Sequence, residues 1–134
     1  EKRRRNFELL KAELRDAEDH LILPEPCEGS NPSWFGFIMT CKNGVERDRL
    51  VRLIESRGVQ TRMLFAGNLI RQPCFDQMRS TGFGYRMVGN LSVTDEIMRS
   101  SFWVGVYPGL TEEMICYMAK VIKEAISDCR RARV

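Results

Sequence analysis

Apolar side chains spaced for an amphipathic helix lie near both ends of the chain. Between residues 2 and 20 they recur at alternating intervals of three and four positions, which predicts a first helix over residues 2–20. Its apolar stripe consists of Phe7, Leu10, Leu14, Ala17 and Leu21. A second stripe follows Thr111, which is placed to cap a final helix. That stripe consists of Ile115, Met118, Ile122, Ala125 and Ile126.

Three short apolar runs between these helices predict strands. They cover residues 34–41, 59–65 and 102–107. A helical pattern at residues 45–57 separates the first two runs, and Gly58 stands where a helix C-terminus favours a left-handed residue. Before the third run we expect a short helix that ends at Arg99 and is capped by Ser92 or Thr94.

The run at residues 34–41 is apolar on both of its alternating faces. Phe35 and Phe37 fall on one face, and Trp34 and Ile38 fall on the other. A strand of this kind belongs in the middle of a sheet that has helices on one face and some other body on the second.

The predicted order is helix, strand, helix, strand, short helix, strand and helix. It suits an α/β domain with about three strands and helices packed mainly on one face of the sheet. Each connection between strands is long, so hairpins between consecutive strands are not expected. A length of 134 residues is that of one ordinary domain, and we expect residues 1–134 to form a single domain.

The net charge of +3 is concentrated in basic runs at residues 2–5 and 130–133. These runs lack interleaved aromatic side chains that could stack on bases, which favours solvated helix ends over nucleic-acid binding. No stretch approaches the roughly 18 apolar residues that a membrane span needs. We therefore expect a cytoplasmic protein that binds neither nucleic acid nor membrane.

The five cysteines are odd in number and show no CxxC spacing. They are Cys27, Cys41, Cys74, Cys116 and Cys129. We expect free thiols, most of them packed in the core, and no metal site built from this chain alone. Reduced thiols fit the cytoplasm.

Groups suited to covalent or acid–base catalysis are scarce. His20 stands beside Asp19 without an accompanying Cys or Ser motif, so a solvent-facing or capping histidine is favoured over a general base. The lysines fall on predicted helices or a turn, and no Walker or GxGxxG motif is present. No catalytic residue is predicted within the chain.

One polar loop, at residues 61–75, could bind a ligand. Arg62 and Arg71 offer donors suited to phosphate or carboxylate, and Asn68 and Gln72 offer amides suited to sugar hydroxyl and keto groups. Composition equally allows a structural loop in which the arginines pair with structural carboxylates and the asparagine holds a left-handed turn. Both readings stay open on the residues alone.

Three longer runs resemble the C-terminal part of the sugar-modifying DegT/DnrJ/EryC/StrS aminotransferase-like family. They are Pro-Ser-Trp-Phe-Gly-Phe at residues 32–37, Thr-Arg-Met-Leu-Phe-Ala-Gly-Asn-Leu-Ile-Arg-Gln-Pro at 61–73 and Phe-Trp-Val-Gly-Val-Tyr-Pro-Gly-Leu-Thr at 102–111. Within the family these three sequence runs are most similar to those of the CDP-4-keto-6-deoxy-D-glucose 3-dehydrases of lipopolysaccharide and deoxysugar biosynthesis. The resemblance covers about residues 3–126 and implies the small C-terminal domain of a fold-type I transferase. The first helix then links this domain to an N-terminal cofactor domain.

The resemblance implies removal of the C3 hydroxyl from a nucleotide-linked 4-keto-6-deoxyhexose by a complete enzyme. Pyridoxamine or pyridoxal phosphate would supply the electron sink, and a [2Fe–2S] cluster would receive electrons from a separate reductase. In the family both groups belong to the preceding domain, so neither is expected on this chain, which we expect to be inactive alone. A homodimer is implied for the complete enzyme, with Arg62, Asn68, Arg71 and Gln72 as substrate contacts. The alternatives are a sugar aminotransferase and a non-catalytic domain that binds nucleotide sugars.

Overall fold

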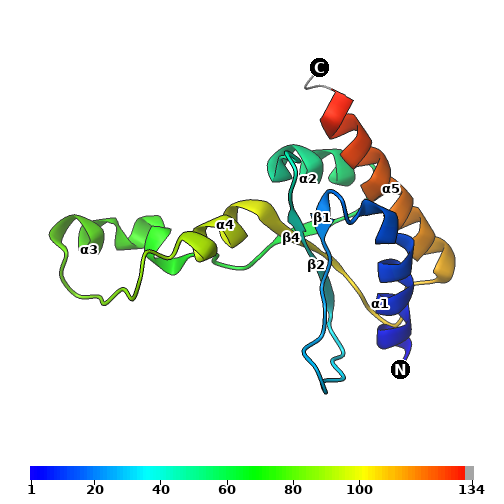
Figure 1. The fold of residues 1–134 in the computed structure, drawn as a ribbon, viewed down its shortest axis with the longest axis horizontal. Coiled ribbons are helices and arrows are strands. Elements are labelled where there is room, and N and C mark those ends of the chain that lie inside the picture. The colour runs from blue at the N-terminus through cyan, green and yellow to red at the C-terminus, as the bar shows by residue number, and fades with distance from the viewer. Residues whose placement is uncertain (132–134) are drawn as a thin grey trace.

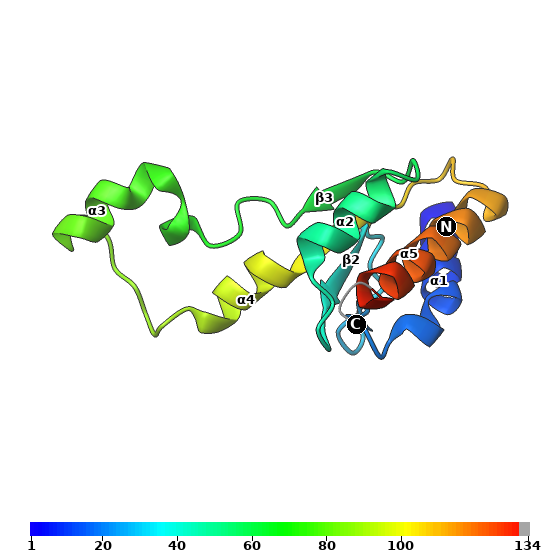
Figure 2. The ribbon, with the colours of Figure 1, turned by 90° about the horizontal axis from the view of Figure 1, so that it is seen from above.

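The computed structural model describes residues 1–131, which form a body and a long arm (Figure 1). The body contains a four-stranded sheet and three long helices. The arm, residues 64–100, leaves the body after one strand and returns at the start of another. Figure 2 shows that it projects away from the side of the body on which α1 and α5 lie.

The sheet is antiparallel throughout and has the order β1-β2-β4-β3. Its strands are β1 (Leu21–Ile22), β2 (Gly36–Cys41), β3 (Thr61–Met63) and β4 (Ser101–Gly105). Strands β2 and β4 form the centre, in a register that pairs Gly36 with Gly105 and Met39 with Phe102. The prediction of an inner strand near residues 34–41 and of an α/β domain is confirmed, with one more strand than expected.

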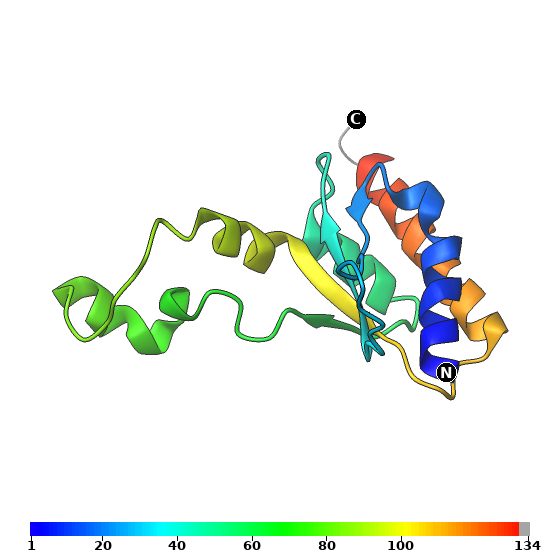
Figure 3. The same ribbon diagram turned by 60° about the horizontal axis from the view of Figure 1, so that its bottom comes forward.

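Three helices cover one face of the sheet (Figure 3). They are α1 (Lys2–Glu13), α2 (Arg47–Glu55) and α5 (Glu112–Arg131). The core lies between these helices and the alternate strand residues Phe37, Met39, Phe102 and Val104, all of which are fully buried. The predicted stripe of the last helix is buried throughout, and Thr111 accepts a hydrogen bond from the Met114 amide at 3.2 Å as the predicted cap.

The first predicted helix is too long. The α-helix ends at Glu13, a 3₁₀ turn (η1, Arg15–Ala17) follows, and Leu21 begins strand β1, paired with Cys41. The apolar stripe predicted for this helix is buried as expected. Its last residue, Leu21, faces the core from strand β1, and a single apolar position at the end of a stripe does not distinguish a helix from a strand. The link from this helix to an N-terminal domain stays a prediction.

The alternation predicted for residues 34–41 holds only from Gly36 onward. Trp34 packs on Phe7 in the core, with ring centroids 4.8 Å apart, whereas Phe35 turns to the other side and meets Trp103 at 5.3 Å. Both residues precede the strand, so their side chains need not alternate between the two faces of the sheet. Gly36 leaves room for the Trp103 ring, since a Cβ at this glycine would lie 2.6 Å from it.

The arm carries short helices and has no core of its own. Its elements are η2 (Leu69–Arg71), η3 (Pro73–Phe75), α3 (Asp76–Thr81) and α4 (Ser92–Ser100). In the described chain no residue from 69 to 100 is buried. The arm is fixed at its base by Arg47 of α2, whose Nη1 donates to the Met98 carbonyl at 2.8 Å.

The predicted caps of the arm helix are wrong. Leu91 is the N-cap residue of α4 and adopts φ +54°, so Ser92 is already the first helical residue. The Asn90 side chain accepts a hydrogen bond from the Ser92 amide at 3.1 Å, which supplies part of what a capping side chain would. The capping hydrogen bond is thus accepted two residues upstream of the nearer predicted cap, Ser92.

Candidate functional site

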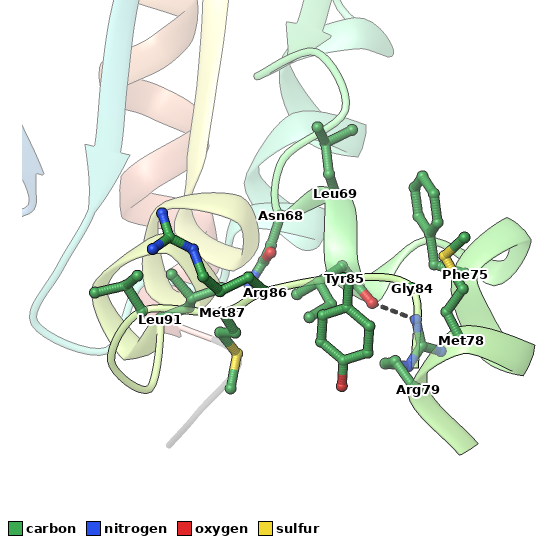
Figure 4. Close-up of a pocket in the computed structure, with 12 residues that line it drawn as sticks. Asn68, Leu69, Phe75, Met78, Arg79, Gly84, Tyr85, Arg86, Met87 and Leu91 are labelled. Carbon is green, nitrogen blue, oxygen red and sulfur yellow. Dashed lines mark hydrogen bonds between the residues drawn. The ribbon is translucent and has the colours of Figure 1, made fainter. Parts of the chain in front are cut away.

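A pocket of about 470 Å³ lies within the arm, between its outgoing limb (residues 64–81) and its returning limb (residues 82–100) (Figure 4). Apolar side chains from both limbs line it, among them Ile70, Met78, Met87 and Leu91. Its size is that of an ordinary small-molecule site. The pocket is therefore the natural place to look for ligand-binding groups.

In addition to Asn68, three polar side chains line the pocket: Arg79, Tyr85 and Arg86. Arg79 is engaged within the outgoing limb: it donates to the carbonyls of Ile70 and Gln72 and pairs with Asp76. The Tyr85 hydroxyl and the Arg86 guanidinium have no hydrogen-bond or ion-pair partner within the described chain. In Figure 4 the Arg86 side chain extends away from Arg79, toward Leu91. The pocket thus offers an unpaired cation and an aromatic hydroxyl among apolar walls.

Beside the pocket, the Asp95 carboxylate joins the two limbs. The Asn68 Nδ2 donates to Asp95 Oδ1 at 2.8 Å, and Arg71 donates from Nε at 3.2 Å and from Nη2 at 2.8 Å. The hydrogen bond from Arg71, and then the one from Asn68, hold the pKa of Asp95 below its usual range. The carboxylate is consequently ionised at neutral pH and holds both partners.

The four predicted substrate contacts do not all meet in this pocket. Asn68 lines it and is 3% exposed. Arg71, at the end of η2, and Gln72, its C-cap residue, do not line the pocket. Gln72 donates through Nε2 to the Ala66 carbonyl at 2.5 Å. Arg62 lies elsewhere, on β3, in a larger pocket of about 920 Å³ that it shares with Trp103 and Tyr117. Their role as substrate contacts stays a prediction.

The structural alternative for the loop is correct in one part and wrong in others. Arg71 does pair with a carboxylate, but the exposed Arg62 has no ion pair in the described chain. Asn68 is extended, at φ −86°, and the left-handed residues are Phe65 and Gly67. A Cβ on Gly67 would lie 2.3 Å from Met98 Cγ, so this glycine permits the close approach of the two limbs.

Sequence reasoning missed Arg79, Tyr85, Arg86 and Asp95. The signal for Tyr85 and Arg86 was an aromatic and a basic residue together in a glycine-rich loop, Gly-Phe-Gly-Tyr-Arg at residues 82–86. Asp95 had only the signature of an acid in the first turn of a helix. Its link to Asn68 and Arg71 spans 27 and 24 positions and has no local sequence pattern.

No disulfide joins the cysteines within residues 1–131, and the expectation that most of them are packed in the core is wrong. Cys27, Cys74 and Cys116 are exposed, and only Cys41 and Cys129 are buried. Burial, followed by the neighbouring Cys129, raises the pKa of Cys41 to about 12. Among residues 1–131 no three His, Cys, Asp or Glu side chains come together as a metal-ligand cluster.

The basic ends and the histidine take part in surface contacts. Arg4 donates to the carbonyls of Asn31 and Pro32, both at 3.2 Å. His20 is half-buried, and its Nε2 lies 3.1 Å from Arg130 Nη1. Arg133, part of the second basic run, lies outside the described residues. No helix in the described part of the chain combines the length and apolar character needed to cross a membrane.

Comparison with known proteins identifies the relatives of this chain. The lipopolysaccharide biosynthesis protein RfbH of Salmonella typhimurium is 47% identical over 126 residues, covering 92% of this chain and 28% of that protein. The dTDP-4-dehydro-2,6-dideoxy-D-glucose 3-dehydratase of Saccharopolyspora spinosa is 42% identical over 127 residues, covering 93% and 26%. The chain thus spans little more than a quarter of the length of these relatives.

Solved structures agree with this assignment. E. coli GDP-4-keto-6-deoxy-D-mannose-3-dehydratase with bound hydrated PLP superposes with a TM-score of 0.73 at 25% identity, over 90% of this chain and 30% of that one. An aminotransferase from Psychrobacter cryohalolentis, at 22% identity, shares the fold with a TM-score of 0.75, over 96% of this chain and 34% of that one. The profile of the DegT/DnrJ/EryC1/StrS aminotransferase family matches residues 1–123. With nearly the whole of the described chain inside that match, the protein belongs to the DegT/DnrJ/EryC1/StrS aminotransferase family.

Proposed function

We propose that this chain is the C-terminal domain of a nucleotide-sugar 3-dehydratase that removes the C3 hydroxyl of CDP-4-keto-6-deoxy-D-glucose. The observation that carries the proposal is the identity of 42% to a protein named as a sugar 3-dehydratase, over 93% of the chain. The 47% identity to a lipopolysaccharide biosynthesis protein supports a role in making deoxysugars for that polymer. The likeness to an aminotransferase, at 22% identity, concerns the fold alone.

The pocket of the arm suits one part of such a substrate. A nucleotide sugar combines an anionic diphosphate with sugar hydroxyls and a base. The unpaired Arg86 guanidinium could bind phosphate oxygens, and the Tyr85 ring and hydroxyl offer a stacking surface and a donor. The predicted contacts Arg62, Asn68, Arg71 and Gln72 remain part of the proposal as residues that bind or shape this end of the substrate.

The described residues do not form a site for the cofactors that the proposal requires. Among residues 1–131 no three potential metal ligands lie together, and the lysines lie on helices or a turn. The complete enzyme would hold pyridoxamine or pyridoxal phosphate, which supplies an amine and an electron sink, in the remaining part of the polypeptide. A [2Fe–2S] cluster there, a separate reductase and a homodimer complete the proposal, and the isolated chain would be inactive.

The experiment uses the complete protein with pyridoxamine phosphate, CDP-4-keto-6-deoxy-D-glucose and an electron-donating reductase. We expect a product that lacks the C3 oxygen, detected by mass spectrometry and NMR, and no product from residues 1–134 alone. A parallel reaction offers L-glutamate in place of the reductase. An amino sugar that keeps its C3 hydroxyl would instead establish the alternative, a nucleotide-sugar aminotransferase, and binding without turnover would establish a non-catalytic sugar-binding protein.

A further inference from the structure

Few contacts hold the two limbs of the arm together. The arm has no buried residue from 69 to 100 in the described chain, so packing of a core cannot fix the separation of its limbs. Apart from the Gly82 amide, which donates to the Met78 carbonyl where the limbs join, the hydrogen bonds between the limbs in the described chain end on two residues of the returning limb, Asp95 and Met98. The Met98 contact is a weak one, from the Asn68 amide to a thioether sulfur at 3.2 Å.

Asp95 therefore makes the strong link. Its two carboxylate oxygens accept three hydrogen bonds, two of them from the fork of Arg71, and charge-assisted pairs of this geometry are the most directional that side chains make. The Asp95 side chain is 22% exposed and Asn68 is nearly fully buried, whereas the Arg71 side chain is 50% exposed, so the bond from Asn68 is the shielded half of the link.

The link lies next to the pocket walls. Asn68 begins the wall on the outgoing limb, and Leu91, at the start of α4, belongs to the wall on the returning limb. Asp95 is four residues beyond Leu91, one turn into the same helix, and the Asp95 amide donates to the Leu91 carbonyl at 2.9 Å. A change in the Asp95 contacts moves the start of α4, and with it one wall of the pocket.

We infer that Asp95 is a positioning residue: by holding Asn68 and Arg71 it fixes the separation of the pocket walls and thereby sets the affinity for the nucleotide sugar. This inference rests on the proposed function, because it takes the pocket to be part of the substrate site. It also gives Arg71 a specific role. The guanidinium acts through Asp95, to which its Nε and Nη2 donate, and not by direct contact with the ligand.

The test uses the complete enzyme and compares Asp95→Ala and Asp95→Asn with Glu96→Ala. Glu96 is the matched control, since it is an adjacent acid on the same helix. Within residues 1–131 its partners are Arg99 and Ser100, and it does not line the pocket. We expect Asp95→Ala to raise KM for the sugar nucleotide about tenfold while kcat changes less than about twofold. Asp95→Asn, which keeps the shape and loses the charge, should show a smaller rise. Glu96→Ala should match the wild type in both constants.

A double-mutant cycle separates positioning from direct contact. If Arg71 acts through Asp95, Arg71→Ala combined with Asp95→Ala is no worse than the poorer single variant. Multiplied effects on KM would overturn the inference, because they would show an independent contact of Arg71 with substrate.

Amide hydrogen exchange supplies a reading that needs no substrate. Loss of the link should speed exchange in α4 severalfold in both Asp95 variants and leave α5 unchanged. Unchanged exchange in α4 would overturn the inference even for a protein that turns over no nucleotide sugar. A wild type that shows no turnover while the Asp95 variants speed exchange would reject the proposed substrate and keep the limb-positioning role.

Discussion

At the scale of single residues, Asn6 shows how one buried amide ties distant segments. It lies on α1 with 8% of its surface exposed, and its Nδ2 donates to the carbonyls of Tyr107 and Leu110 at 2.9 and 3.2 Å. These carbonyls belong to the turn that leads from β4 to α5. The amide supplies both donors of its nitrogen to these carbonyls, and the Tyr107 carbonyl also accepts from the Leu110 amide at 3.2 Å.

We predict that Asn6→Asp destabilises the fold by about 3 kcal/mol at neutral pH, because a carboxylate would face two carbonyl oxygens that it cannot serve as donor. Urea unfolding of the variant and the wild type measures the difference. Asn31→Asp is the control, since Asn31 is exposed and only its backbone carbonyl takes part in a contact. Equal losses in both variants would mean that the change in charge, and not the buried contact, is responsible.

The cysteines give a second prediction at this scale. The pKa of Cys41 is about 12, so near pH 8 only about 1 in 10,000 Cys41 side chains is in the reactive thiolate form. Cys27, Cys74 and Cys116, by contrast, are exposed to the reagent. We expect these three to be alkylated first, as measured peptide by peptide with mass spectrometry, and Cys41 only on unfolding. Early alkylation of Cys41 would contradict its burial.

The same shift in Cys41 affects stability at high pH. Its pKa is raised from 9.0 to about 12 in the folded state, so the unfolded chain loses this proton first as the pH rises. The contribution of Cys41 is therefore complete below about pH 9 and is lost progressively as the pH approaches about 12.

At the scale of elements, local sequence signals predicted some structure and failed for the rest. The stripe of α5, its Thr111 cap and the left-handed Gly58 are set by neighbouring positions, and each was predicted correctly. Strand β1 escaped prediction because two residues carry no period of their own, and the strand exists through pairing with residues about 20 positions away. The Asp95 link has the same character, since only the fold brings its partners together.

Two glycines of the arm allow a matched test of the contact between limbs. Gly67 and Gly82 both have positive φ, +60° and +68°, but a Cβ would strike Met98 only at Gly67. We predict that Gly67→Ala speeds hydrogen exchange in α4 by roughly tenfold, equal to about 1.4 kcal/mol, and that Gly82→Ala does not. Combining Gly67→Ala with Met98→Ala should recover part of the loss. If Met98→Ala does not slow the exchange in α4 again, backbone strain at residue 67 alone causes the faster exchange.

At the scale of the whole molecule, stability is divided unequally between body and arm. The body buries its apolar residues around α5 and the centre of the sheet, while the arm exposes residues such as Phe83 and Val88, at 83% and 73%. Exposed apolar side chains of this extent are typical of a surface that contacts another body. Sequence pattern could not reveal this division, because the apolar content of residues 64–100 is that of an ordinary packed segment.

We predict that trypsin cuts an isolated chain of residues 1–134 first after Arg86, which lies outside any helix or strand in the arm. Arg52 is the internal control, because it is equally exposed but lies within α2. Mass spectrometry of early digestion products identifies the site. First cleavage after Arg52 would show that the body opens before the arm. In the complete protein the cut after Arg86 should slow if the arm is covered.

The contact between Gly36 and the Trp103 ring has a practical consequence. Trp103 donates from Nε1 to the Met63 carbonyl at 3.1 Å and its ring lies 6.2 Å from that of Phe65, at the root of the arm. The chain's other tryptophan, Trp34, packs on Phe7 and also lines a small pocket together with Phe65 and Trp103. The two indoles lie near the same point, so their signals would overlap. With Trp34 replaced by phenylalanine, Trp103 is the remaining tryptophan, and intrinsic fluorescence becomes a built-in optical gauge of how the arm leaves the sheet, without any attached label.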